Sequence, residues 1–111
     1  MIFLKRGISY DKKNDYDRAI TDFTRAIELD PVKGDFYHNR GFALKKKNLL
    51  HEAIIDFTEC IHLEKNHFKA YYNRANCYEK IGELELARLD YFKANDIVKY
   101  LINLFILFNN K

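Results

Sequence analysis

Four histidines and two cysteines are the side chains of this 111-residue chain best suited to bind a metal ion. Imidazole and thiolate groups bind Zn²⁺, and structural zinc sites take their ligands from closely spaced pairs along the chain. Such pairs are missing, because His62 follows Cys60 by two residues and therefore lies on a different face of a helix. The other candidates are scattered: His38, His51, His67 and Cys77. We expect no metal ligand among them.

Motifs for catalysis and nucleotide binding are also absent from the sequence. It contains no glycine-rich phosphate loop, no nucleophile elbow and no His-Glu-x-x-His stretch. The net charge of +3 comes from 19 Lys and Arg against 16 Asp and Glu, which is too balanced to indicate a nucleic-acid partner. We expect no enzyme activity, no catalytic residue, no cofactor and no nucleic-acid binding.

The chain is organised by a spacing of 34 residues. Small and aromatic residues recur at this distance, which predicts a repeated structural unit. Four sets show the register: Gly7, Gly41 and Ala75; Ala19, Ala53 and Ala87; Phe23, Phe57 and Tyr91; Ala26, Cys60 and Ala94. Within each unit the apolar residues return at helical spacing. We expect helices over residues 2–13, 17–30, 35–47, 51–64, 68–81 and 85–97.

Residues that tolerate a left-handed backbone, Asn14, Asn48 and Gly82, mark short turns inside the three pairs. Gly7 and Gly41 are expected to face Ala19 and Ala53, so that paired helices approach closely. Aromatic residues at this spacing are expected in the core. Both cysteines occupy positions where other units have alanine, so we expect buried, unreactive thiols.

Two rows of charge share the same register. Arg6, Arg40 and Arg74 recur on the first helix of each unit, and Asp22, Asp56 and Asp90 recur on the second. We predict a ladder of three ion pairs inside the repeats. The alternative is two solvated rows without contact, since exposed ion pairs contribute little to stability.

These repeated positions resemble the tetratricopeptide repeat. The stretches that carry the resemblance are Tyr37–Gly41, Tyr71–Ala75 and Ala19–Pro31. The resemblance implies an all-α, right-handed superhelical solenoid of antiparallel helix pairs, whose first helices line a concave groove for a peptide or partner helix. We place three repeats at 1–33, 34–67 and 68–98, followed by a hydrophobic helix at 99–111. Lys65 and Lys99 replace the closing proline of the family, so the second and third repeats can run on.

The side chains expected to line the groove lie on the first helices, pointing away from the paired helix. This set is Lys5, Ile8, Lys12, Asn39, Phe42, Lys46, Lys69, Tyr72, Asn73 and Asn76, with His38, Lys45, Glu79 and Lys80 nearby. Asparagine amides can hold a peptide backbone, and lysines favour an acidic segment. The alternative is an ordinary solvated face.

Some members of the family bind the Glu-Glu-Val-Asp tails of chaperones through five polar residues: a Lys and an Asn, then an Asn, then a Lys and an Arg. The matching positions here are Leu4, Ile8, Asn39, Lys69 and Asn73. The first Lys, the first Asn and the Arg are therefore missing. With so few donors for a carboxylate, we do not expect chaperone tails to bind.

The segment from residue 97 to 108 is apolar almost all round, where a solenoid normally ends in a polar face. It is too short to span a membrane, which needs about 20 apolar residues. We expect a partner to cover it, and self-association, a larger assembly and insertion into a membrane surface are equally compatible with the sequence. The residues of this surface are Leu101, Ile102, Leu104, Phe105, Leu107 and Phe108. The alternative is a capping helix that packs one side on the third repeat and leaves the other exposed.

The sequence therefore predicts a non-catalytic protein-interaction module or scaffold that holds a partner peptide or helix in its groove. The alternative is a structural subunit of a larger assembly, such as a cytoskeletal one, docked through the C-terminal helix. The absence of a secretory signal in the sequence and its unpaired cysteine pattern favour a cytoplasmic location.

Overall fold

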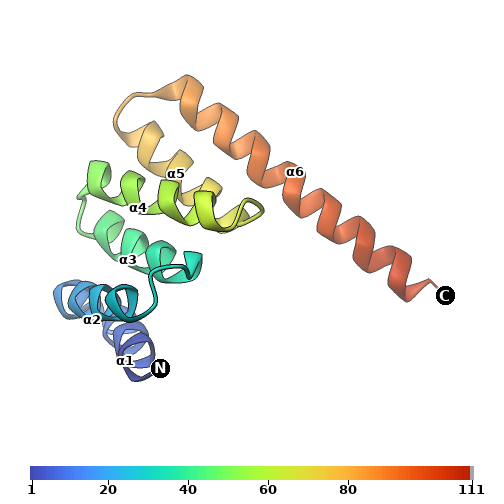
Figure 1. Cartoon of the computed structure of the whole chain (residues 1–111). Coiled ribbons are helices and arrows are strands. Elements are labelled where there is room, and N and C mark those ends of the chain that lie inside the picture. The colour runs from blue at the N-terminus through green and yellow to red at the C-terminus, as the bar shows by residue number, and fades with distance from the viewer. Residues whose placement is uncertain (111) are drawn as a thin grey trace.

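Residues 1–110 are described by a computed structural model, which contains six helices in this part of the chain. They are α1 (Ile2–Lys12), α2 (Tyr16–Leu29), α3 (Gly34–Lys46), α4 (Leu50–Leu63), α5 (Phe68–Lys80) and α6 (Leu84–Asn109). Helix pairs α1–α2, α3–α4 and α5–α6 stack one on the next into a curved array (Figure 1). The repeating helix pairs predicted from the sequence are confirmed.

The turns within the pairs adopt the backbone conformation that their residues favour. Asn14 and Asn48 have φ of 63° and Gly82 has φ of 87°, the left-handed region that asparagine and glycine tolerate best. Asp15 then caps α2, because its carboxylate accepts a hydrogen bond from the Arg18 backbone N–H at 3.3 Å. These short turns keep the two helices of each pair antiparallel and adjacent.

Phenylalanine rings fill the interior of the first two pairs. Phe23 and Phe57 are buried, and each ring lies against a glycine of the paired helix. A Cβ atom added to Gly41 would stand 2.9 Å from Cε1 of Phe57, closer than real Cβ contacts. The glycines therefore face phenylalanine rings first, not Ala19 and Ala53 as the sequence suggested. Both cysteines are buried free thiols, as expected.

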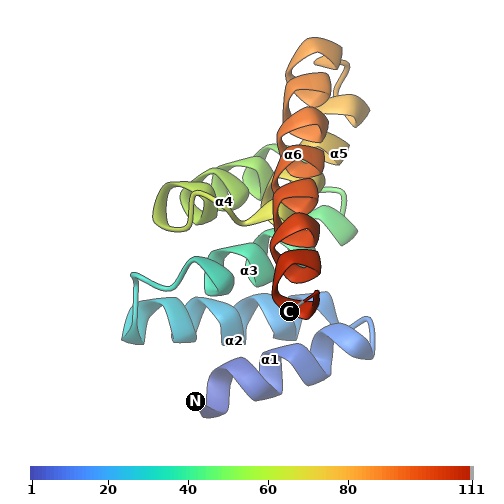
Figure 2. The same ribbon diagram turned by 90° about the vertical axis from the view of Figure 1, so that its right-hand side faces the viewer.

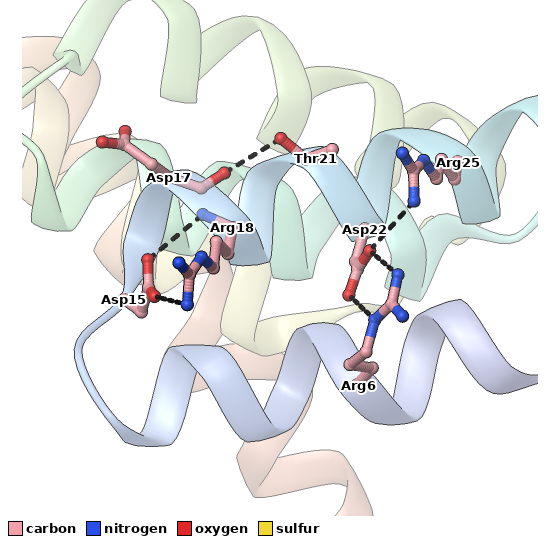
Figure 3. Close-up of polar contacts among 7 residues, drawn as sticks. All are labelled: Arg6, Asp15, Asp17, Arg18, Thr21, Asp22 and Arg25. Atoms are coloured by element: carbon pink, nitrogen blue, oxygen red, sulfur yellow. Dashed lines mark hydrogen bonds and ion pairs between the residues drawn. The ribbon is translucent and has the colours of Figure 1, made fainter.

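The predicted ladder of arginine–aspartate pairs is present in all three repeats. Each guanidinium donates two hydrogen bonds to one carboxylate: Arg6 to Asp22 at 2.7 and 2.9 Å, Arg40 to Asp56 at 2.8 and 2.8 Å, and Arg74 to Asp90 at 2.7 and 2.8 Å. The first rung is drawn in Figure 3. Its hydrogen bonds from Arg6 lower the pKa of Asp22.

The ladder also joins one repeat to the next. Nη1 of Arg40 donates to the Thr24 hydroxyl of the preceding repeat at 3.3 Å, and Nη1 of Arg74 donates to Thr58 at 3.2 Å. The aspartates are almost fully buried while the guanidinium groups stay partly exposed. The two charge rows thus bind the helices within a pair and the pairs along the array.

Helix α6 continues well beyond the third repeat. It runs unbroken from Leu84 to Asn109, so the helix end expected at residue 97 is wrong. The reason is local: no glycine or proline interrupts this stretch, and its leucines favour helix. Its helix-to-helix packing within residues 1–110 is with α5, and its C-terminal half projects from the array (Figures 1 and 2). Lys111, the last residue of the predicted C-terminal segment, lies outside the described residues.

Within the described chain, no helix combines the length and the apolar character that crossing a membrane requires.

Candidate functional site: the polar face of α1, α3 and α5

The side chains predicted to line the groove lie on the first helix of each pair. Lys5 and Lys12 of α1, Lys46 of α3, and Lys69 and Tyr72 of α5 are exposed. Ile8, Asn39, Phe42 and Asn76 are half-buried. The rings and amides therefore lie below a rim of ammonium groups, because the long lysine stems carry their charge outward.

Asn73 differs from the rest of the set because both ends of its amide contact the preceding repeat, whereas Nδ2 of Asn76 donates to the Tyr72 carbonyl of its own helix at 2.9 Å. Oδ1 of Asn73 accepts a hydrogen bond from the Lys45 ammonium at 3.0 Å, and its Nδ2 lies 3.0 Å from Nε2 of His38. The side chain is only 8% exposed. Sequence reasoning placed Asn73 on this face but had no signal for these two partners, which come from the preceding repeat.

The contacts of Asn73 define the protonation of His38. Lys45 can only donate, so Asn73 turns its amide nitrogen to His38, whose Nε2 must accept. His38 is therefore neutral. Burial, with a further contribution from the His67 ring stacked 4.8 Å away, lowers its pKa to about 4.

The ring of Phe42 contacts the ammonium groups of two lysines of α3. The ammonium groups of Lys45 and Lys46 lie 5.4 and 5.3 Å from the ring centroid, within the range of cation–π contacts. These contacts hold both lysines along the face between α1 and α5. An acidic side chain that reached Phe42 would therefore meet two ammonium groups.

A cavity of about 240 Å³ adjoins this face at the third repeat, beside the N-terminal half of α5. It lies between α5 and α6 and is lined by Phe68, Lys69, Tyr72, Asn73, Ala94, Asn95 and Val98. Three of these residues belong to the predicted groove set, and the rest were not predicted.

The second predicted surface, the projecting end of α6, is apolar and exposed. Phe105 is 69% exposed, Leu101, Ile102, Leu107 and Phe108 are also exposed, and Leu104 is half-buried. Tyr100 and Ile106, which lie in the apolar segment 97–108 identified from the sequence, are exposed as well. Exposed apolar surface of this extent is typical of an interaction site.

A third group of side chains comes together at the other end of α3. Asp35, Cys60, Glu64 and His67 converge there, beside a cavity of about 600 Å³ that Leu101 of α6 helps to line. A search for closely spaced cysteines and histidines missed this group, although Cys60, Glu64 and His67 stand four and three residues apart in the sequence. Nothing in the sequence pointed to Asp35, which comes from another helix.

Comparison with known proteins identifies the fold. No curated protein matches the chain significantly by this comparison. Among solved structures, the second TPR of Spaghetti (RPAP3) bound to the HSP90 peptide SRMEEVD shares 29% identity with a TM-score of 0.84, covering 86% of this chain and 88% of that one. The first TPR of the same protein, bound to the same peptide, shares 26% identity with a TM-score of 0.85, covering 86% and 76%.

The TPR domain of Arabidopsis OM64, at 24% identity and a TM-score of 0.85 over 86% of this chain and 79% of that one, shows likeness of fold alone. Sequence profiles of the tetratricopeptide repeat match residues 2–31, 34–67 and 57–88. The predicted all-α superhelical solenoid of antiparallel pairs is confirmed. The chain belongs to the tetratricopeptide repeat family.

Proposed function

We propose that this chain is a non-catalytic protein-interaction module that holds a partner peptide or helix against the polar face of α1, α3 and α5. One observation carries the proposal: this face presents lysine, asparagine and aromatic side chains beside a cavity of about 240 Å³. Two structural neighbours, the TPR domains of Spaghetti, are complexes with an HSP90 peptide, which supports the same mode of use.

An acidic partner fits this face best. None of Lys5, Lys12, Lys46 and Lys69 is in salt-bridge contact with an acidic side chain of residues 1–110. Their ammonium groups can therefore receive carboxylates of a partner without first breaking an internal ion pair. Asn39, half-buried between them, can bind the peptide backbone through its amide.

Chaperone tails are not the partner we propose. Leu4 and Ile8 stand where the tail-binding members have Lys and Asn, and Asn73 stands where they have Arg. The Asn73 amide is also engaged by Lys45 and His38, so it offers little to a terminal carboxylate. Fewer charged donors mean weaker binding of a Glu-Glu-Val-Asp tail.

The experiment selects ligands from a random peptide display library and measures the affinity of the selected peptides by fluorescence polarisation. We expect peptides rich in Asp and Glu, bound at least tenfold more tightly than SRMEEVD. The Asn39→Ala, Lys69→Ala double variant should weaken binding at least tenfold, while Lys33→Ala, which removes an exposed lysine outside the groove set, should not. If the double variant binds the peptides as tightly as Lys33→Ala does, the peptide-binding site lies elsewhere.

A second candidate function is a structural subunit docked through the C-terminal half of α6, favoured by the exposure of Leu101, Phe105 and Leu107. The Leu101→Ser, Phe105→Ser double variant tests it by light scattering at several concentrations. If this surface is the main interface, the unmodified chain associates and the variant is a folded monomer. If both are monomers, the surface does not drive self-association, and docking to another protein is tested by pull-down with the same pair.

We also propose a cytoplasmic location. Both cysteines remain free thiols in the fold, which suits a reducing compartment. Fractionation of cells that produce the chain from its native gene tests this directly.

A further inference from the structure

Four potential metal ligands converge where α3 begins and α4 gives way to α5. Asp35 lies in the first turn of α3, Cys60 and Glu64 are one helical turn apart at the end of α4, and His67 is the N-cap of α5. One ligand atom each from Cys60, Glu64 and His67 lie within 4.8 Å of one another. Oδ1 of Asp35 lies 2.7 Å from Nε2 of His67, and Oε2 of Glu64 lies 4.0 Å from the same nitrogen.

The spacing of these atoms brackets that of a tetrahedral zinc site. Zinc binds sulfur at about 2.3 Å and nitrogen or oxygen at about 2.0–2.2 Å, so its ligand atoms stand about 3.3–3.7 Å apart. The two separations from Nε2 of His67, 2.7 Å to Asp35 and 4.0 Å to Glu64, lie on either side of that range, and the ligand atoms of Cys60, Glu64 and His67 are all within 4.8 Å of one another. Rotation of the Asp35 and Glu64 side chains that moves their carboxylate oxygens by a few tenths of an ångström to about one ångström gives the spacing that zinc requires.

The negative charges of the Asp35 and Glu64 carboxylates favour binding of a cation. Across residues 1–110, His67 is the sole salt-bridge partner of both Asp35 and Glu64. A divalent ion would neutralise the carboxylates and stabilise the thiolate.

These residues do not recur as a set along the chain. Shifted by one repeat, the positions of Cys60, His67 and Asp35 hold no potential metal ligand, and Glu64 alone has an acidic counterpart. Cys60 corresponds to Ala26 and Ala94, Glu64 to Asp30 and Val98, His67 to Lys33 and Leu101, and Asp35 to Met1 and Lys69. The group is therefore an addition to the repeat framework, confined to the junction of the second and third repeats.

The geometry points to a Zn²⁺ site formed by Cys60, Glu64 and His67, with one sulfur, one oxygen and one nitrogen ligand, and with Asp35 beside it as the hydrogen-bond partner of His67. Sulfur and imidazole ligands suit zinc better than calcium or magnesium. The adjoining cavity of about 600 Å³, lined by Asp35, Glu64 and His67, gives the ion an entry path. This differs from the expectation of no metal ligand, which rested on spacing along the chain.

Binding of the ion moves two protons. The Cys60 thiol releases its proton when sulfur binds zinc. In the metal-free chain Nδ1 of His67 accepts a hydrogen bond from the Ala70 N–H at 3.1 Å, so Nε2 carries the ring proton and donates it to Asp35. Zinc at Nε2 transfers this proton to Nδ1, and the Ala70 N–H loses its acceptor.

The test uses the untagged full chain, freed of metal with a chelator and titrated with Co²⁺ and then Zn²⁺. We expect one Co²⁺ per chain with a thiolate-to-cobalt charge-transfer band, displaced by Zn²⁺, and release of protons on binding. The Cys60→Ala variant should lose the band and bind at least about 100-fold more weakly. It should fold, because alanine fills the same position in the other repeats.

The matched control is Cys77→Ala, which removes the other buried thiol at a position where the second repeat has Ala43. This variant should bind as the unmodified chain does. Equal affinity in Cys60→Ala and the unmodified chain would overturn the proposal, because the metal would then be held by exposed histidines such as His51 and His62. Absence of binding, or a site that needs Cys77, would overturn it as well.

Discussion

Acidification from pH 7 to pH 5 should destabilise the fold through one residue, His38. Its neutral ring accepts a hydrogen bond from Asn73 and faces His67, Lys45 and Lys69, with Asp35 as the opposing acidic group. Burial and then His67 lower its pKa from 6.5 to about 4. The unfolded chain therefore takes up a proton near pH 6.5, whereas the folded chain resists protonation until about pH 4.

The sign and size of the effect follow from this difference. Between these two pKa values the unfolded state binds more protons, so the free energy of unfolding decreases as the pH falls. Linkage gives a loss of about 2 kcal/mol between pH 7 and pH 5, approaching about 3 kcal/mol near pH 4. Cationic neighbours Lys45 and Lys69 act in the same direction.

The assay is urea unfolding followed by far-ultraviolet circular dichroism at both pH values. The His38→Gln variant cannot titrate, yet it keeps an acceptor for the amide of Asn73. We expect the unmodified chain to lose about 2 kcal/mol more than this variant, while His62→Gln, at an exposed histidine, should lose as much as the unmodified chain. Equal losses in the unmodified chain and His38→Gln would refute the reasoning.

Two further predictions concern the core of the array. Arg40→Ala should lower the free energy of unfolding by about 3 kcal/mol, because it leaves the buried carboxylate of Asp56 without its partner. Arg18→Ala, which breaks an exposed pair, should cost about 1 kcal/mol or less in the same urea titration, and similar losses in the two variants would contradict the role given to the ladder. Gly41→Leu should lower the free energy of unfolding by about 1–3 kcal/mol relative to Gly41→Ala, because the larger side chain meets the ring of Phe57. Thermal unfolding measures this difference, and equal stability of the two variants would show that the ring can move aside.

The repeat spacing explains why most of the fold could be predicted. Residues 34 apart occupy the same environment in a solenoid, so Arg40 and Asp56 could be paired by register before any distance was known. The same register placed both cysteines among alanines and located the turns at Asn14, Asn48 and Gly82. Errors remained where position alone did not decide contact, as for Gly41, which faces Phe57.

Features that break the repeat could not be predicted in this way. The amide of Asn73 is held by His38 and Lys45 of the preceding repeat, and such contacts depend on how far the helices are rotated about each other. The convergence of Cys60 and His67 with Asp35 has no equivalent in the other repeats, so register carried no signal for it. The run-on of α6 is the exception, because Lys99 stands where the family has its closing proline and indicated that the third repeat can continue; only the unbroken length of the helix was not predicted.

The most direct test of the proposed function is a ¹H–¹⁵N NMR titration of the full chain with an acidic peptide selected from the display library. We expect the shift changes to concentrate on α3 and α5, at the side-chain amide of Asn39 and the backbone around Lys69 and Tyr72. Changes confined to the exposed end of α6, around Leu101 and Phe105, would contradict it and assign binding to that surface. Changes confined to α2 and α4 would contradict both proposals for the interaction surface.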